Sequence, residues 1–190
     1  LTGSSAGVTS LMKRTGARPG EKIAVTGFPG SAAAGLQLLA QKPAPDSDHE
    51  TMLVESFLKP KPRLDQSALL VETNVMTAID TSDGLLADLR HILNASGTGA
   101  VINVDCIPVN HLVNVGFSKL QVVELALTGG EDYELLFTAG SIIMEQILDR
   151  SPVPVSIIGE ITEGPVGEVR LEGTAAGLFK NNKYGWRHFE

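Results

Sequence analysis

Short β-rich runs alternate with stretches of helical periodicity along most of this 190-residue chain. Residues 23–25 (IAV) and 75–79 (VMTAI) have the composition of buried strands, and each is followed by a stretch with helical spacing. Over residues 85–93, leucine and isoleucine recur on one helical face until Gly97 interrupts the pattern. Strand–helix alternation of this kind favours one sheet with helices packed on it. We therefore predict an α/β fold, a single domain with a mixed β-sheet covered by helices.

The same patterns predict the remaining elements. Ser31 is placed to cap a helix over residues 32–41. The prolines of residues 59–63 (KPKPR) predict an extended linker whose three basic side chains are exposed to solvent. The other predicted elements are helices over 49–57, from 64 onward, over 120–127 and over 142–148, and strands over 100–104, 133–137, 155–158 and 168–171.

Charge and apolar patterning restrict the class of protein. The chain has 15 lysine and arginine residues against 22 aspartate and glutamate residues, and its net charge of −7 argues against nucleic acid as a partner. No apolar run reaches about 18 residues and the first residues carry no signal-peptide pattern, so we expect no membrane span and a cytoplasmic location. The single cysteine, Cys106, excludes an internal disulfide, and the four histidines lack zinc-site spacing.

Two carboxylates and a hydroxyl group lie close together in residues 78–84 (AIDTSDG), between a predicted strand and a helix N-terminus. Hard cations such as Mg²⁺ take oxygen ligands, so Asp80 and Asp83 on one turn suit a magnesium–phosphate complex. Ser82, which lies between them, can donate a hydrogen bond to a phosphate oxygen. The alternative is that Ser82 or Asp83 caps the helix that begins at Leu85, and the two roles are compatible.

A second acidic segment, residues 128–133 (TGGEDY), has two glycines and two acids directly before a predicted strand. It predicts the wall of a ligand site, and the alternative is a glycine turn with solvated acids. Arg14 can pair with a nucleotide phosphate or be an ordinary surface arginine. Trp186 can stack on a planar ligand or attach the C-terminal tail to the core. No residue is predicted to act as a covalent catalytic nucleophile.

Taken together and in this order, these segments resemble the C-terminal part of the thiamine-monophosphate kinase family, in the aminoimidazole-ribonucleotide-synthetase superfamily. The resemblance implies transfer of the γ-phosphoryl group of ATP to thiamine monophosphate, giving thiamine diphosphate, with Mg²⁺ and without a P-loop. The matching segments run almost end to end, over residues 13–21 (KRTGARPGE), 25–27, 33–36, 61–63, 78–85, 127–135 and 185–189 (GWRHF).

The resemblance also implies roles for individual residues and a domain organisation. By position, the residues implied are Asp80 and Asp83 for Mg²⁺, Arg14 and Ser82 for ATP, and Glu131 and Trp186 for the thiamine substrate. Residues 1–20 are expected to be an N-terminal arm or the end of a preceding domain, and residues 21–190 a C-terminal kinase-like domain. In the family that preceding domain carries further metal-binding aspartates and the homodimer interface. We expect it to lie outside this sequence, which leaves the chain inactive on its own.

Two other functions remain compatible with the sequence. The chain could be a non-catalytic module that binds a nucleotide or a partner protein, or a superfamily relative that acts on another small phosphate substrate. Residues 129–133 and 185–189 favour the thiamine enzyme over the second alternative, because by resemblance they belong to its substrate side.

Overall fold

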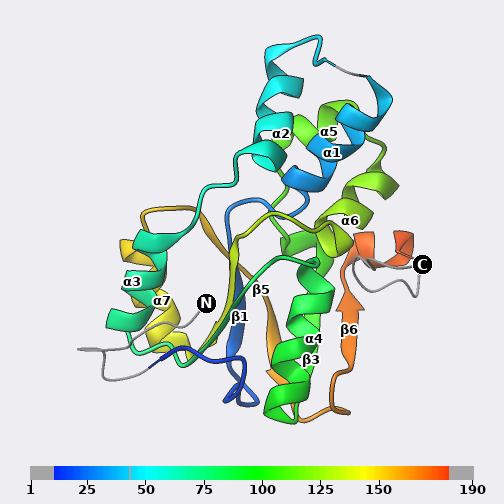
Figure 1. Cartoon of the computed structure of the whole chain (residues 1–190). Coiled ribbons are helices and arrows are strands. Elements are labelled where there is room, and N and C mark those ends of the chain that lie inside the picture. The colour runs from blue at the N-terminus through cyan, green and yellow to red at the C-terminus, as the bar shows by residue number, and fades with distance from the viewer. Residues whose placement is uncertain (1–10, 43, 180–190) are drawn as a thin grey trace.

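The computed structural model describes residues 11–42 and 44–179, and in this part of the chain six strands form one sheet (Figure 1). The strand order is β2-β4-β1-β5-β3-β6. Neighbouring strands are antiparallel except β3 and β6, which are parallel, so the predicted mixed sheet is confirmed. The strands are β1 (Lys22–Thr26), β2 (Thr77–Asp80), β3 (Gly99–Asn103), β4 (Leu135–Ala139), β5 (Val155–Thr162) and β6 (Val169–Glu172).

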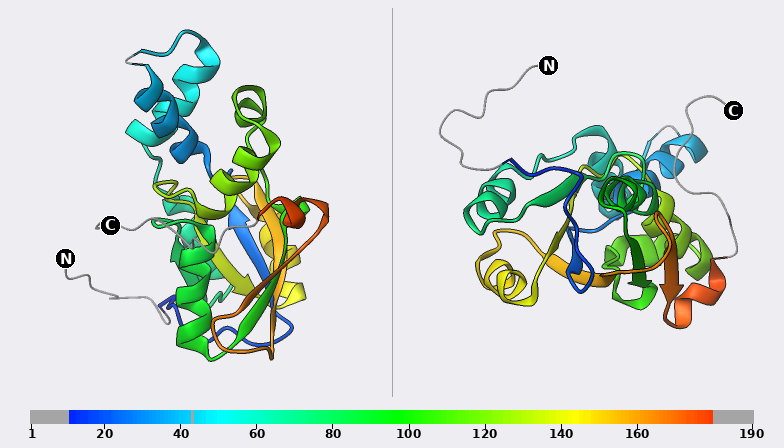
Figure 2. Two further views of the ribbon diagram at one scale, coloured as in Figure 1. Left: turned by 90° about the vertical axis from the view of Figure 1, so that its right-hand side faces the viewer. Right: turned by 90° about the horizontal axis from the view of Figure 1, so that it is seen from below.

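Helices cover both faces of the sheet and extend beyond one of its ends (Figures 1 and 2). One face is covered by α4 (Leu85–Ser96), against which α6 (Lys119–Thr128) packs, and the other by α3 (Leu64–Glu72) and α7 (Ser141–Arg150). A lobe at the end of the sheet, here called the helical lobe, consists of α1 (Ser31–Gln41), α2 (Asp48–Leu58) and α5 (His111–Gly116). Two 3-10 turns, η1 (Val104–Cys106) and η2 (Thr174–Leu178), complete the described elements.

The central strands send successive side chains into different cores. In β1, Ile23 and Val25 pack in the core beneath α4, whereas Ala24 packs in the core beneath α3 and α7. In β4, Leu136 and Phe137 divide in the same way. Side chains alternate between the faces of a strand, so a strand buried on both faces reads as a continuous apolar run. This explains why these strands appear in the sequence as short apolar runs and not as alternating apolar and polar residues.

Most predicted elements are confirmed, with local differences. Ser31 does not cap α1: it is the first residue of the helix, and Gly30, with φ of 87°, occupies the N-cap position. The strands β2 and β4 each begin two residues later than predicted. In β4 the reason is local, because Tyr133 has a left-handed backbone (φ 51°) that a strand cannot include. The short helix α5 has no counterpart among the predicted elements.

The segment before β1 lies against the sheet and α4. Lys13 pairs with Thr77 at the start of β2, and the Gly20 N–H donates to the Ile161 carbonyl at 2.9 Å. Among the helices in the described part of the chain, none is both long and apolar enough to cross a membrane.

Candidate functional site

The two acidic segments meet at the edge of the sheet where β2 ends and β4 begins. Glu131 N–H donates to the Ser82 carbonyl at 3.0 Å, and Tyr133 N–H donates to the Thr81 carbonyl at 2.9 Å. Thr81 N–H in turn donates to the Glu134 carbonyl at 2.8 Å. These bonds extend the β2–β4 pairing beyond the strands, so segments about 50 residues apart in the sequence form one surface.

Glu131 and Tyr133 both have left-handed backbones, with φ of 69° and 51°. Residues with side chains rarely adopt this conformation, and those held in it cluster at functional sites. The Tyr133 hydroxyl donates to the Glu131 carboxylate at 2.8 Å. This bond raises the pKa of Tyr133, and the negative charges of Asp80 and Asp83 act in the same direction. The four side chains therefore share one electrostatic environment.

A further carboxylate, Asp88, lies behind the Asp80–Asp83 turn. It is buried in the first turn of α4 and accepts hydrogen bonds from the Ser82 and Asp83 backbone N–H groups at 2.9 and 3.0 Å. Ligand atoms of Asp83, Asp88 and His91 lie within 4.8 Å of one another. Neither Ser82 nor Asp83 caps α4, since Gly84 holds the N-cap position, so the capping alternative is wrong.

Asp132, next to Glu131 in the second acidic segment, contacts the helical lobe instead of the first acidic segment. The two oxygens of the Asp132 carboxylate accept hydrogen bonds from the N–H groups of Gly30 and Ala32 at 2.6 and 2.9 Å, at the start of α1. Burial raises the pKa of Asp132 to about 7, although these N–H groups act in the opposite direction. Asp132 thus joins the acidic segment to the helical lobe.

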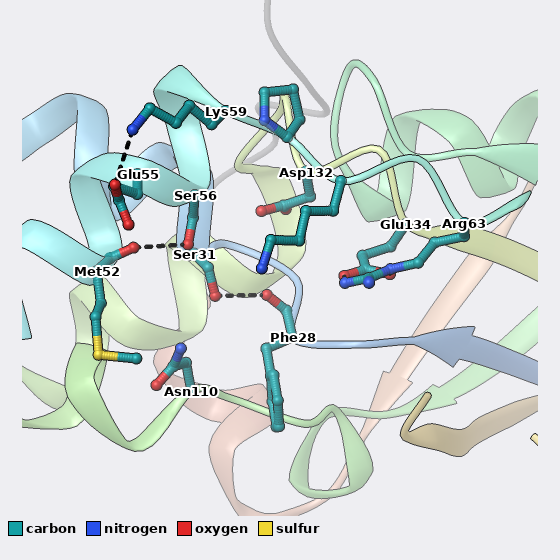
Figure 3. A pocket seen from close by; sticks show the side chains of 12 residues that line it. Phe28, Ser31, Met52, Glu55, Ser56, Lys59, Arg63, Asn110, Asp132 and Glu134 are labelled. Atoms are coloured by element: carbon teal, nitrogen blue, oxygen red, sulfur yellow. Dashed lines mark hydrogen bonds and ion pairs between the residues drawn. The ribbon is translucent and has the colours of Figure 1, made fainter. Parts of the chain in front are cut away.

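Glu134 is almost fully buried and is paired with Arg63 from the proline-rich linker. The Arg63 guanidinium donates to both carboxylate oxygens, at 2.7 and 2.5 Å, and Thr26 donates to one of them. Gly27 lies so close that a Cβ there would be 1.9 Å from a Glu134 oxygen. The prediction that Arg63 is an exposed linker residue is therefore wrong, because Glu134 holds it against the sheet (Figure 3).

A pocket of about 300 Å³ lies between the linker, α2, the start of α1 and residues Asp132 and Glu134 (Figure 3). Phe28 and Met52 give it apolar surface. Lys61 also lines it and makes no ion pair within the described ranges. The pocket can accept a small molecule with an apolar part and an anionic group, and its lining does not include Asp80, Asp83 or Glu131.

The structure brings together four of the six predicted site residues. Asp80, Ser82, Asp83 and Glu131 lie on the joined acidic segments. Arg14 is exposed beside the start of β2, the opposite end of the strand from Asp80, and forms no ion pair with the acidic residues in the part of the chain that is described. Trp186 lies outside the described residues.

Sequence reasoning missed the carboxylates that support these segments. Asp88 had a visible signal, because it interrupts the apolar face formed by Leu85, Leu89 and Ile92. Asp132 was visible only as one of the two acids of the second segment, and nothing local indicated its partners or that of Glu134, since these lie 102 and 71 residues away in the sequence.

Comparison with known proteins identifies the class. Residues 18–172 match the family model described as AIR synthase related protein, C-terminal domain. The match covers most of the chain, and the protein belongs to this family. The relatives it resembles include thiamine-monophosphate kinases. The kinase of Escherichia coli (strain K12) is 39% identical over 158 residues, which cover 80% of this chain and 47% of the relative.

Solved structures show the same similarity. The thiamine-monophosphate kinase from Stenotrophomonas maltophilia K279a has 31% sequence identity and a TM-score of 0.79, covering 88% of this chain and 54% of that chain. AaThiL complexed with AMPPCP and TMP has 30% identity and a TM-score of 0.79, covering 95% of this chain and 55% of that chain. These matches confirm the fold and the resemblance, and this chain spans about half the length of these relatives.

Proposed function

We propose that this chain is the C-terminal part of a thiamine-monophosphate kinase and forms one wall of its site for ATP and thiamine monophosphate. The observation that carries the proposal is the set of hydrogen bonds between residues 81–82 and 131–134, which joins the two acidic segments into one surface. The similarity to thiamine-monophosphate kinases over 80% or more of the chain supports this substrate pair.

The donor set of this surface fits a hard divalent cation. Asp80 and Asp83 supply carboxylate oxygens, which Mg²⁺ prefers to nitrogen or sulfur ligands. We assign these two aspartates to Mg²⁺ and Ser82 to ATP. Arg14, which lies at the other end of β2, is assigned to ATP on the family resemblance alone. Bound Mg²⁺ would neutralise the charge of the transferred phosphoryl group. Phosphoryl transfer needs positioning and charge stabilisation rather than a protein nucleophile, which agrees with the oxygen ligands gathered here.

Glu131 and Trp186 are assigned to the thiamine part of the substrate. The thiazolium ring of thiamine is flat and cationic, so a carboxylate and an aromatic face are suitable contacts. Tyr133 donates a hydrogen bond to Glu131 and thereby orients its carboxylate. We further propose that the full-length protein is a cytoplasmic homodimer formed through a domain that precedes this chain.

The test is phosphoryl transfer by the full-length protein and by its Asp80→Ala and Asp83→Ala variants. Each substitution removes charge compensation at the transferring group, so we expect kcat to fall by about 10²-fold or more. Asp48→Ala, an exposed aspartate in the first turn of α2, is the control and should retain wild-type rates. Wild-type rates in both site variants would contradict the proposal.

A further inference from the structure

Asp88 is a carboxylate in a place where apolar residues are expected. It lies on the face of α4 that also carries Leu85, Leu89 and Ile92, and only 2% of its surface is exposed. Burial raises its pKa, which reflects the cost of removing a carboxylate from water. A residue that costs free energy at this position needs compensating contacts, and those contacts show what it does.

The contacts are two backbone N–H groups of the acidic turn. One carboxylate oxygen, Oδ2, accepts from both the Ser82 and Asp83 N–H groups, at 2.9 and 3.0 Å. Both N–H groups precede Gly84, the N-cap residue of α4, and so lie outside the helix. Asp88 reaches back from the first turn of the helix and fixes the two peptide groups that carry the Ser82 and Asp83 side chains.

The attachment acts at the centre of the turn. Asp80 is held by its pairing with Leu135 in β4, and the helix begins at Leu85. The Ser82 carbonyl is held by Glu131 N–H on the other side. With Asp88 removed, the turn keeps its two ends and the backbone bonds of Thr81 and Ser82 to residues 131–134, but the Ser82 and Asp83 N–H groups lose their acceptor.

We propose that Asp88 is a positioning residue that fixes the direction of the Ser82 and Asp83 side chains toward a divalent cation and its nucleotide. This inference rests on the proposed function for the identity of the ligands. The attachment itself is a property of the fold. It therefore has a readout that does not depend on catalysis.

The first measurement is amide hydrogen exchange at single-residue resolution in the full-length protein. Asp88→Ala should accelerate exchange at the Ser82 and Asp83 amides by about tenfold or more, because both lose their acceptor. Asp88→Asn should accelerate it less, because the carboxamide oxygen still accepts. Asp65→Ala is the matched control, an exposed aspartate in the first turn of α3, and should leave both amides unchanged.

The second measurement is binding of Mn²⁺ alone, followed by electron paramagnetic resonance. Supporting residues around a metal site are worth about 10-fold to 100-fold in affinity, so Asp88→Ala should weaken Mn²⁺ binding by about tenfold or more. Asp88→Asn should weaken it less than about threefold.

Two results would overturn the inference. One is unchanged exchange at the Ser82 and Asp83 amides in Asp88→Ala or, should that variant not fold, in Asp88→Leu, which also lacks an acceptor. The other is a loss of Mn²⁺ binding in Asp88→Asn as large as in Asp88→Ala, which would make the negative charge, and not the attachment, the important property. A full-length protein without phosphoryl-transfer activity would refute the proposed function and leave both measurements interpretable.

Discussion

At the scale of single residues, three carboxylates hold the candidate site together from behind. Asp88 accepts two backbone N–H groups of the first acidic turn, Asp132 accepts two at the start of α1, and Glu134 pairs with Arg63. Each replaces water with fixed donors, which is the condition for burying an acid. Asp88 and Glu134 are buried, whereas Asp80 is exposed and Ser82, Asp83 and Glu131 are half-buried, so these four side chains remain accessible at the surface.

The raised pKa of Asp132 makes stability depend on pH. The unfolded chain ionises Asp132 near its ordinary value of 3.8, whereas the folded protein holds the proton up to pH about 7. The folded state binds the proton more tightly, so this stabilising contribution is complete below pH 4 and is lost as pH rises to 7. The loss is at most about 1.4 kcal/mol per pH unit.

Denaturant unfolding of the full-length protein between pH 5 and 8 tests this. Relative to Asp132→Asn, which cannot ionise, the wild type should lose stability up to pH 7 and then level off. Asp105→Asn is the control. Backbone N–H groups of Thr174 and Ala175 lower the pKa of Asp105, so its difference from the wild type should be constant above pH 5. A constant difference for Asp132→Asn as well would show that burial does not raise its pKa.

At the scale of elements, the helical lobe depends on a close approach of α1 and α2. Gly35 in α1 faces the backbone of α2, and a Cβ at Gly35 would lie 2.1 Å from the Leu53 carbonyl oxygen. Backbone atoms cannot move aside as a flexible side chain can. The glycine is therefore required by packing, although it lies in the middle of a helix, where glycine is unfavourable.

Replacing Gly35 with alanine should destabilise the protein despite the better helix propensity of alanine. Forcing apart two packed helices costs about 1–3 kcal/mol, which exceeds the gain in propensity of about 1 kcal/mol. Gly116→Ala in α5 is the matched control, because nothing lies within 4 Å of a Cβ there, and it should be neutral or stabilising. Thermal unfolding of both variants measures the change in stability. A higher unfolding temperature for Gly35→Ala would contradict the prediction that the contact between α1 and α2 requires glycine.

At the scale of the whole molecule, the buried apolar side chains of the described residues form three cores. Two lie on opposite faces of the sheet, and the third lies inside the helical lobe between α1, α2, α5 and the outer side of α6. The lobe is joined to the sheet core through α6, which contributes to both, and through the Asp132 contacts. Fewer buried side chains hold the lobe than hold the core beneath α4.

This division predicts unequal amide hydrogen exchange in the full-length protein. The α2 amides should exchange through local opening of the lobe, faster than the α4 amides, which we expect to exchange through global unfolding. Exchange of α2 as slow as that of α4 would show that the lobe and the sheet unfold as one unit. Mass-spectrometric exchange of the same sample reports both helices, so each is the control for the other.

The sequence by itself determined the alternation of strands and helices, the mixed-sheet class and the two acidic segments, because these depend on spacing between near neighbours. Tertiary structure decided which carboxylates hold the loops and which remain accessible at the candidate site. Adjacent residues Glu131 and Asp132 face different parts of the molecule, and their partners lie up to about a hundred residues away. Arg63 lies in a segment whose composition is typical of a solvated linker, and only its pairing with Glu134 in the folded protein holds it against the sheet. Strand order sets such pairings, and local periodicity carries no record of strand order.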